Sequence, residues 1–155
     1  MNNMNDNNKI EILISALKER YQSIHNIRDR VQNTGIWILG ILSGASGWLI
    51  QSNLYLTCFN KIIYLLALFA TYHAIRFHYL EDLNKGFKGQ QRVAAKIEKT
   101  LNLFSHKFFS EDEESLYPES WQKAGTEKGD GNFFETTYLL INLGFIFLSI
   151  AIIFN

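Results

Sequence analysis

Residues 134–154 read FETTYLLINLGFIFLSIAIIF, and Glu135 is the only charged side chain in this stretch. Between positions 133 and 154, fourteen residues are Leu, Ile or Phe. At about −0.4 kcal/mol each, they favour bilayer insertion by roughly 5 kcal/mol before the cost of polar groups such as Asn142 is subtracted. The stretch has no polar face to meet water, and its length suits a hydrocarbon core that takes roughly 20 residues to cross. It therefore predicts a transmembrane helix over 133–154.

Two apolar stretches upstream predict two more membrane-spanning helices. The first, 34–51, is rich in Gly and Ser and has Trp37 and Trp48 near its opposite ends, as expected of residues that gather at membrane–water interfaces. The second, 54–79, is uninterruptedly apolar at 62–70. We therefore predict an all-α integral membrane protein with three transmembrane helices, forming a single membrane domain over 1–155.

Basic residues set the expected orientation. Five lie within 1–34, and five more follow the second span, between Lys85 and Lys99. The turn between the first two spans offers only Lys61, and no basic residue follows the third span. Because cytoplasmic loops carry the excess of Lys and Arg, we expect a bacterial cytoplasmic (inner) membrane protein with its N-terminus inside and its C-terminus outside.

The polar segments predict two long amphipathic cytoplasmic helices. The first, 9–33, has apolar residues at alternating spacings of three and four, which is the pattern of a coiled-coil heptad, although Arg20 occupies one seam position. Its seam consists of Ile10, Leu13, Leu17, Ile24, Ile27 and Val31. The second is expected to reach about Phe104, within a cytoplasmic helix and loop over 80–132. The heptad helix could pair with a second copy of itself or pack on the other helix of its own chain.

The first span also carries small residues at the spacing of a helix-packing interface. They are Gly40, Ser43, Gly44 and Gly47. Small residues four apart let two helix backbones approach closely in lipid, where packing replaces the hydrophobic effect as the attraction. The face could join two subunits, or it could contact the second or third span of the same chain.

An ionisable cluster lies at the membrane edge of the second span, where His73, Arg76 and His78 precede Glu81 and Asp82. Ionisable groups inside a membrane are functional-site hypotheses by default, and His73 could sense protons. The shallow depth also suits simple interfacial snorkelling. Arg76 could pair with Glu81 or Asp82 of its own helix, or with a neighbouring one.

The segment 105–132 is expected to be an irregular loop. It contains the only proline, Pro118, flanked by Tyr117 and Trp121, which could anchor the loop at the interface. The acidic run at 111–114 is expected to be a solvated surface.

Several function classes lack support in the sequence. The lone Cys58 excludes an internal disulfide and a Cys-based metal cage. Zero formal net charge gives no general attraction to nucleic acid. No phosphate-binding glycine loop, nucleophile elbow, zinc signature or dinucleotide fingerprint is present. We therefore expect no catalytic residue, cofactor or metal, and a protein that is not an enzyme.

Two stretches carry a family resemblance: LEDLNKGFKGQQRVAAKIEKTL at 80–101 and YPESW at 117–121. They resemble the post-membrane helix and later Trp box of the RipA-like small integral membrane proteins, over roughly a third of the chain. The chain departs from that group by lacking a proline directly after the helix. Its long N-terminal heptad helix is similar to the SLATT group of bacterial membrane proteins, which are thought to act as effectors in conflict systems. The resemblance implies a homo-oligomeric inner-membrane protein and transfers no catalytic residue.

Three functions are compatible with these features. The first is a homo-oligomeric membrane effector, pore-forming or membrane-perturbing, of a bacterial antiphage defence or stress system. Its partners would be the lipid bilayer, further copies of itself and a cytoplasmic protein or small-molecule trigger, with no nucleic acid. The second is an immunity or scaffold protein that binds another membrane protein. The third is a small transporter or channel subunit that uses the ionisable cluster.

Overall fold

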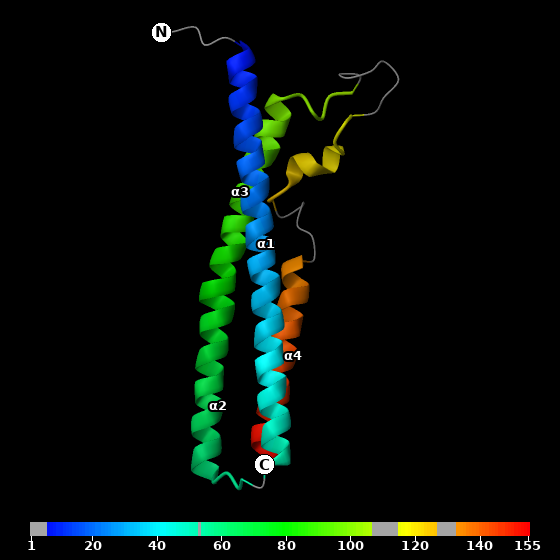
Figure 1. Ribbon diagram of the computed structural model, residues 1–155. Coiled ribbons are helices and arrows are strands. Elements are labelled where there is room, and N and C mark those ends of the chain that lie inside the picture. The colour runs from blue at the N-terminus through cyan, green and yellow to red at the C-terminus, as the bar shows by residue number, and fades with distance from the viewer. Residues whose placement is uncertain (1–5, 53, 107–114, 127–132) are drawn as a thin grey trace. The chain divides into compact units, whose positions relative to one another are not determined.

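The computed structural model describes residues 6–52, 54–106, 115–126 and 133–155, and the acidic run at 111–114 lies outside them. The described elements are all helical, which confirms the all-α prediction (Figure 1). Among these residues, three stretches are long and apolar enough to cross a membrane, namely Asp6–Gln51, Cys58–Thr100 and Phe133–Phe154. In chain order the elements are α1 (Asp6–Gln51), α2 (Cys58–His73), the π-helix η1 (Ala74–Tyr79), α3 (Leu80–Thr100), the 3₁₀ helix η2 (Glu119–Lys123) and α4 (Phe133–Phe154).

The chain forms two compact units. The first unit comprises Met1–Arg28 and Lys85–Gly131, and the second comprises Asp29–Asn84 and Asn132–Asn155. Helices α1 and α3 therefore contribute to both units. The expectation of a single domain over 1–155 stays a prediction.

In the second unit, α2, α4 and the later part of α1 lie side by side (Figure 1). Helices α1 and α4 approach closely because each presents a glycine to the other. A Cβ added to Gly144 would lie 3.1 Å from a methyl carbon of Leu42, and one added to Gly35 would lie 3.0 Å from a methyl carbon of Thr137. Such close backbone approach is how helices gain packing energy in an apolar solvent.

Side-chain hydrogen bonds join the end of α1, the start of α2 and the end of α4. The side-chain amide of Asn155 donates a 2.9 Å hydrogen bond to the carbonyl of Leu49, near the end of α1. The ammonium of Lys61 donates a 2.9 Å hydrogen bond to the carbonyl of Ile153, near the end of α4. Both carbonyls lie in the last turn of their helix, where backbone carbonyls lack the usual helical donor, and that of Leu49 also accepts a 2.9 Å hydrogen bond from the Ser52 hydroxyl. The Lys61 cation also complements the helix dipole of α4. The Lys61 and Asn155 hydrogen bonds join α4 to α2 and to α1 at this end of the second unit.

Helix boundaries differ from the sequence-based ones in informative ways. The range 133–154 is reproduced by α4, and the predicted 9–33 helix runs directly into the 34–51 span as one helix, α1, which begins at Asp6 rather than at residue 9. Helix α2 begins at Cys58, not at 54, because the Thr57 side chain accepts a 3.3 Å hydrogen bond from the Asn60 backbone and caps the helix. The last part of the predicted second span, 74–79, is π-helical.

Helix α3 ends at Thr100 and not near Phe104 as predicted. Asn102 adopts a left-handed backbone conformation with φ 60°. The Leu103 amide then bonds to the Glu98 carbonyl and the Asn102 amide to the Lys99 carbonyl, both at 3.1 Å. This pair of bonds is the Schellman helix end, which accepts asparagine as well as glycine.

In the first unit, the early part of α1 packs antiparallel on α3. Arg20 donates a 2.9 Å hydrogen bond to the side chain of Gln90, and Tyr21 donates one of 2.6 Å to the side chain of Glu98. Later on α1, a methyl carbon of Ile27 lies 3.9 Å from where a Cβ on Gly86 would be. The residue that interrupts the heptad seam, Arg20, is thus a polar contact between the two helices.

Candidate functional site

The small residues of α1 form a face that is open on the outside of the second unit. Gly40, Ser43, Gly44 and Gly47 are all exposed. A Cβ added to any of the three glycines would meet no atom within 4 Å among the residues that the structure describes. The interpretation of this face as an intrachain contact therefore finds no support within 6–52, 54–106, 115–126 and 133–155.

The glycines that bring α1 and α4 together are different ones. Gly35 and Gly144 pack against side chains of the other helix, and Ser46 is buried with its hydroxyl bonded to the Leu42 carbonyl at 2.6 Å. Sequence reasoning missed this role. The spacing of Gly35, Leu42 and Ser46, at seven and four residues, places them on one side of the helix and could have indicated a second contact face.

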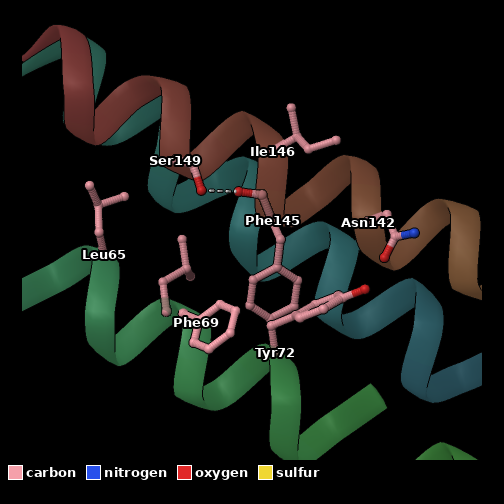
Figure 2. A pocket seen from close by; sticks show the side chains of 8 residues that line it. Leu65, Phe69, Tyr72, Asn142, Phe145, Ile146 and Ser149 are labelled. Atoms are coloured by element: carbon pink, nitrogen blue, oxygen red, sulfur yellow. Dashed lines mark hydrogen bonds between the residues drawn. The ribbon is translucent and has the colours of Figure 1, made fainter. Parts of the chain in front are cut away.

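A groove runs between α2 and α4, with a volume of about 460 Å³ (Figure 2). It is lined by Leu65, Leu68, Phe69, Tyr72, Asn142, Phe145, Ile146 and Ser149. Tyr72 and Phe145 meet edge to face across it, with ring centroids 5.2 Å apart. The Ser149 hydroxyl bonds back to the Phe145 carbonyl at 2.8 Å, whereas the buried amide oxygen of Asn142 accepts no hydrogen bond from any described residue.

The ionisable cluster lies on and beside the π-helix. The rings of His73 and His78 have centroids 5.8 Å apart, and both side chains are exposed. The guanidinium carbon of Arg76 lies 3.4 Å from the centroid of the Tyr138 ring on α4. In the described part of the chain, Arg76 forms no ion pair with Glu81 or Asp82, the partners that its own helix offered. The π-helix instead directs Arg76 to an aromatic ring, and π-turns of this kind are frequent at functional sites.

The heptad seam lies largely toward the inside of its own chain. Leu17 and Val31 are buried, and Leu13, Ile24 and Ile27 are half-buried. Ile10, at the start of α1, is exposed. These burial classes, with the hydrogen bonds to α3, favour packing within the chain over pairing of two heptad helices.

The residues around the only proline pack within the first unit. The Tyr117 ring lies 6.0 Å from the ring of Phe104 and 5.3 Å from that of Trp121, and Pro118 immediately precedes η2. Trp121 is exposed. Anchoring of this loop at a membrane interface stays a prediction.

A buried carboxylate in the first unit was not singled out in the sequence. Glu98 of α3 is 4% exposed and accepts the Tyr21 hydrogen bond, while the Tyr117 hydroxyl lies 3.4 Å from the Tyr21 hydroxyl. Burial, and next the hydrogen bond to Glu98, raise the pKa of Tyr21 above its usual range. A signal was available, because Glu98 falls four residues after Ala94 and three before Leu101, on the apolar stripe of α3.

No family model, no curated protein and no solved structure matches this chain. The resemblance to RipA-like and SLATT-like proteins therefore stays a prediction. Among the described residues, no group of three or more His, Cys, Asp or Glu side chains could hold a metal ion. The features that the chain offers for function are thus its exposed apolar faces, the groove between α2 and α4, and the polar contacts within each of the two units.

Proposed function

We propose that the chain is a small homo-oligomeric inner-membrane protein that acts as an effector of a bacterial defence or stress system. A trigger acts on the cytoplasmic helices, and the assembled spans open a pore or perturb the bilayer. The observation that carries the proposal is the exposed small-residue face of α1, at whose three glycines an added Cβ would meet no described atom within 4 Å.

Membrane insertion is supported by how little of the apolar surface the chain covers. No residue in the apolar window of the second span is buried, and large side chains such as Trp37, Ile41 and Trp48 stand exposed on α1. An apolar surface of this extent requires lipid or further copies around it. The positive-inside rule, which counts Lys and Arg and not net charge, then gives the proposed orientation, with the 1–34 and 80–132 segments, which hold most of the Lys and Arg residues, in the cytoplasm.

Self-association is supported by the chemistry of the α1 face. In lipid, helices associate through close packing and interhelical hydrogen bonds, and exposed glycines provide the closest approach. Gly40 and Gly44 are four residues apart, as are Ser43 and Gly47, so both rows lie along one side of the helix. A second α1 helix packed here would bury this side without moving the α1–α4 contact.

The test of assembly is the mass of the particle in a neutral detergent, together with crosslinking in native membranes. We expect the wild-type chain to form an oligomer, and Gly44→Leu to shift it to the monomer. Ala70→Leu is the matched control, because it introduces the same leucine side chain at an exposed position of α2 and should leave the oligomer intact. A monomeric wild-type particle, or a stoichiometric complex with a different membrane protein, would contradict self-assembly and favour the scaffold or immunity alternative.

The test of the effector activity is the membrane potential of cells after induced expression, together with dye release from vesicles that hold the purified protein. We expect depolarisation and release by the wild-type chain and a large reduction for Gly44→Leu. Unchanged potential and intact vesicles with an oligomeric wild-type protein would reject the effector function while leaving the assembly standing.

A further inference from the structure

Three cations share one side of α3 in the first unit. Arg92, Lys96 and Lys99 follow one another at spacings of four and three residues, which places them on the same side of the helix. Together with the small, buried Ala95, they line a cavity of about 220 Å³. Three like charges close together repel one another, so this side of α3 favours an anion.

The opposite wall of the cavity comes from the segment that follows Trp121. Gln122, Ala124 and Thr126 line it. Two turns shape this segment, because the Ala124 amide bonds to the Trp121 carbonyl at 3.0 Å and the Thr126 amide bonds to the Lys123 carbonyl at 3.1 Å. The wall thus has a defined backbone conformation and offers the polar amide of Gln122.

Gly125 allows the backbone of this wall to lie directly against α3. Its φ of 77° is a conformation that other L-residues rarely adopt. A Cβ at this position would collide with the Lys88 carbonyl oxygen and would lie 3.0 Å from the Arg92 backbone nitrogen. Only glycine permits the loop to approach the helix so closely, so the cavity depends on this one residue.

The three cations are not neutralised by the described part of the chain. The ion pairs that it forms include Lys9–Asp6, Arg20–Glu19 and His106–Glu119, and no described carboxylate pairs with Arg92, Lys96 or Lys99. The lining itself contains no acidic residue. Arg92 makes one weak contact to its own helix, from Nε to the Lys88 carbonyl at 3.4 Å.

We propose that this cavity binds a phosphate group. The planar guanidinium of Arg92 matches two oxygens of a phosphate, and the two ammonium groups act as point charges beside it. The cavity is smaller than the 300 Å³ or so at which sites for drug-sized ligands begin, so it suits a phosphate or pyrophosphate moiety rather than a whole nucleotide. The phosphate belongs either to a free phosphate compound or to a phospholipid headgroup. This proposal does not rest on the effector function.

The binding test uses the full chain in an uncharged detergent, titrated calorimetrically with inorganic pyrophosphate. We expect saturable binding that weakens with added salt, and a double variant Lys96→Gln/Lys99→Gln that binds more weakly by on the order of tenfold for each cation removed. The matched control is Lys18→Gln/Lys85→Gln, which removes the same charge from exposed positions of α1 and α3 outside the cavity. Its affinity should stay within about twofold of the wild type. Equal loss in both variants would overturn the proposal, because it would mean general charge attraction.

The source of the phosphate is tested by the reactivity of lysine amines toward an acetylating reagent. If pyrophosphate protects Lys96 and Lys99 but not Lys85, the site takes a free phosphate compound. If those two lysines are protected in mixed micelles with phosphatidylglycerol but not with phosphatidylcholine, and free pyrophosphate has no effect, the site takes a lipid headgroup. No selective protection under either condition would overturn the site.

Discussion

The hydroxyl of Tyr21 donates a 2.6 Å hydrogen bond to the carboxylate of Glu98, joining α1 to α3 at a position where Glu98 is 4% exposed. Tyr21→Phe removes this donor and leaves the buried carboxylate with one partner fewer. We expect the free energy of unfolding of the first unit to fall by about 1–3 kcal/mol. Denaturant titration of the helical circular dichroism signal measures it. Tyr117→Phe is the control, since its 3.4 Å contact to Tyr21 is weaker, and an equal loss in both variants would contradict the assignment.

The same hydrogen bond predicts a pH dependence. Because the pKa of Tyr21 is raised in the folded chain, first by burial and then by the Glu98 hydrogen bond, the unfolded chain releases this proton at a lower pH than the folded chain does. The stabilisation is complete below about pH 10, where free tyrosine ionises, and is lost as the pH rises above it. We expect the stability difference between wild type and Tyr21→Phe to shrink above about pH 10. A difference that is constant up to strongly alkaline pH would contradict this.

Gly144, which packs against α1, and Gly44, on the exposed face of α1, predict different effects of the same glycine-to-leucine substitution on the stability of the second unit. Gly144→Leu forces a side chain into the space filled by Leu39 and Leu42, and overpacking of this kind costs about 1–3 kcal/mol. Gly44→Leu meets open space within the described chain. We expect thermal unfolding in detergent, at a protein concentration where both variants are monomeric, to be lowered only by Gly144→Leu. Equal destabilisation of the monomer by both would mean that the α1 face is occupied within the chain.

The sequence was most informative where a pattern spans many residues. The long apolar run at 133–154 predicted α4 to the residue, and the heptad over 9–33 predicted a helix, although it left open whether that helix pairs with a second copy or packs on α3. It was least informative where a single residue decides the geometry. The helix end at Asn102 depends on one left-handed residue, and periodicity does not report it.

The candidate sites likewise differ in whether a sequence pattern or the three-dimensional packing decides them. The exposed small-residue face could be located from spacing, although which of several glycine pairs faces outward depends on the three-dimensional packing of α4. Arg76 could be recognised as ionisable, but its contact with Tyr138 joins residues far apart in the chain and follows from the π-helix, which has no signature in the sequence. The cavity beside Arg92 likewise requires Gly125, more than thirty residues away, and could not be found from the lysine spacing alone.

The Arg76–Tyr138 contact predicts a requirement for an aromatic ring at position 138. Tyr138→Phe keeps the ring face under the guanidinium, whereas Tyr138→Leu removes it. A cation over a ring is worth about 0.5–2 kcal/mol, and more where water is excluded. We therefore expect the leucine variant, in detergent, to unfold at a clearly lower midpoint concentration of denaturant than the phenylalanine variant. In an Arg76→Gln background the two variants should differ much less, and an unchanged difference would show that the ring matters only for packing.

Gly125 and Gly89 predict opposite effects of the same glycine-to-alanine change within the first unit. Gly89 lies inside α3 with nothing within 4 Å of an added Cβ among the described residues, so alanine there should stabilise the helix by about 0.5–1 kcal/mol. Gly125→Ala must adopt a left-handed conformation that costs about 1 kcal/mol and must also relieve the collision with the Lys88 carbonyl. We expect Gly125→Ala to lower the thermal midpoint of the first unit and Gly89→Ala to raise it.

The Gly125→Ala variant also separates stability from binding. Because the collision pushes the 124–126 segment away from α3, pyrophosphate affinity should fall in a variant that retains all three cations, whereas Gly89→Ala should bind as the wild type does. Circular dichroism at the temperature of the titration verifies that Gly125→Ala is still folded. Unchanged affinity in a folded Gly125→Ala variant would mean that the loop wall contributes nothing and that exposed charges on α3 account for the binding.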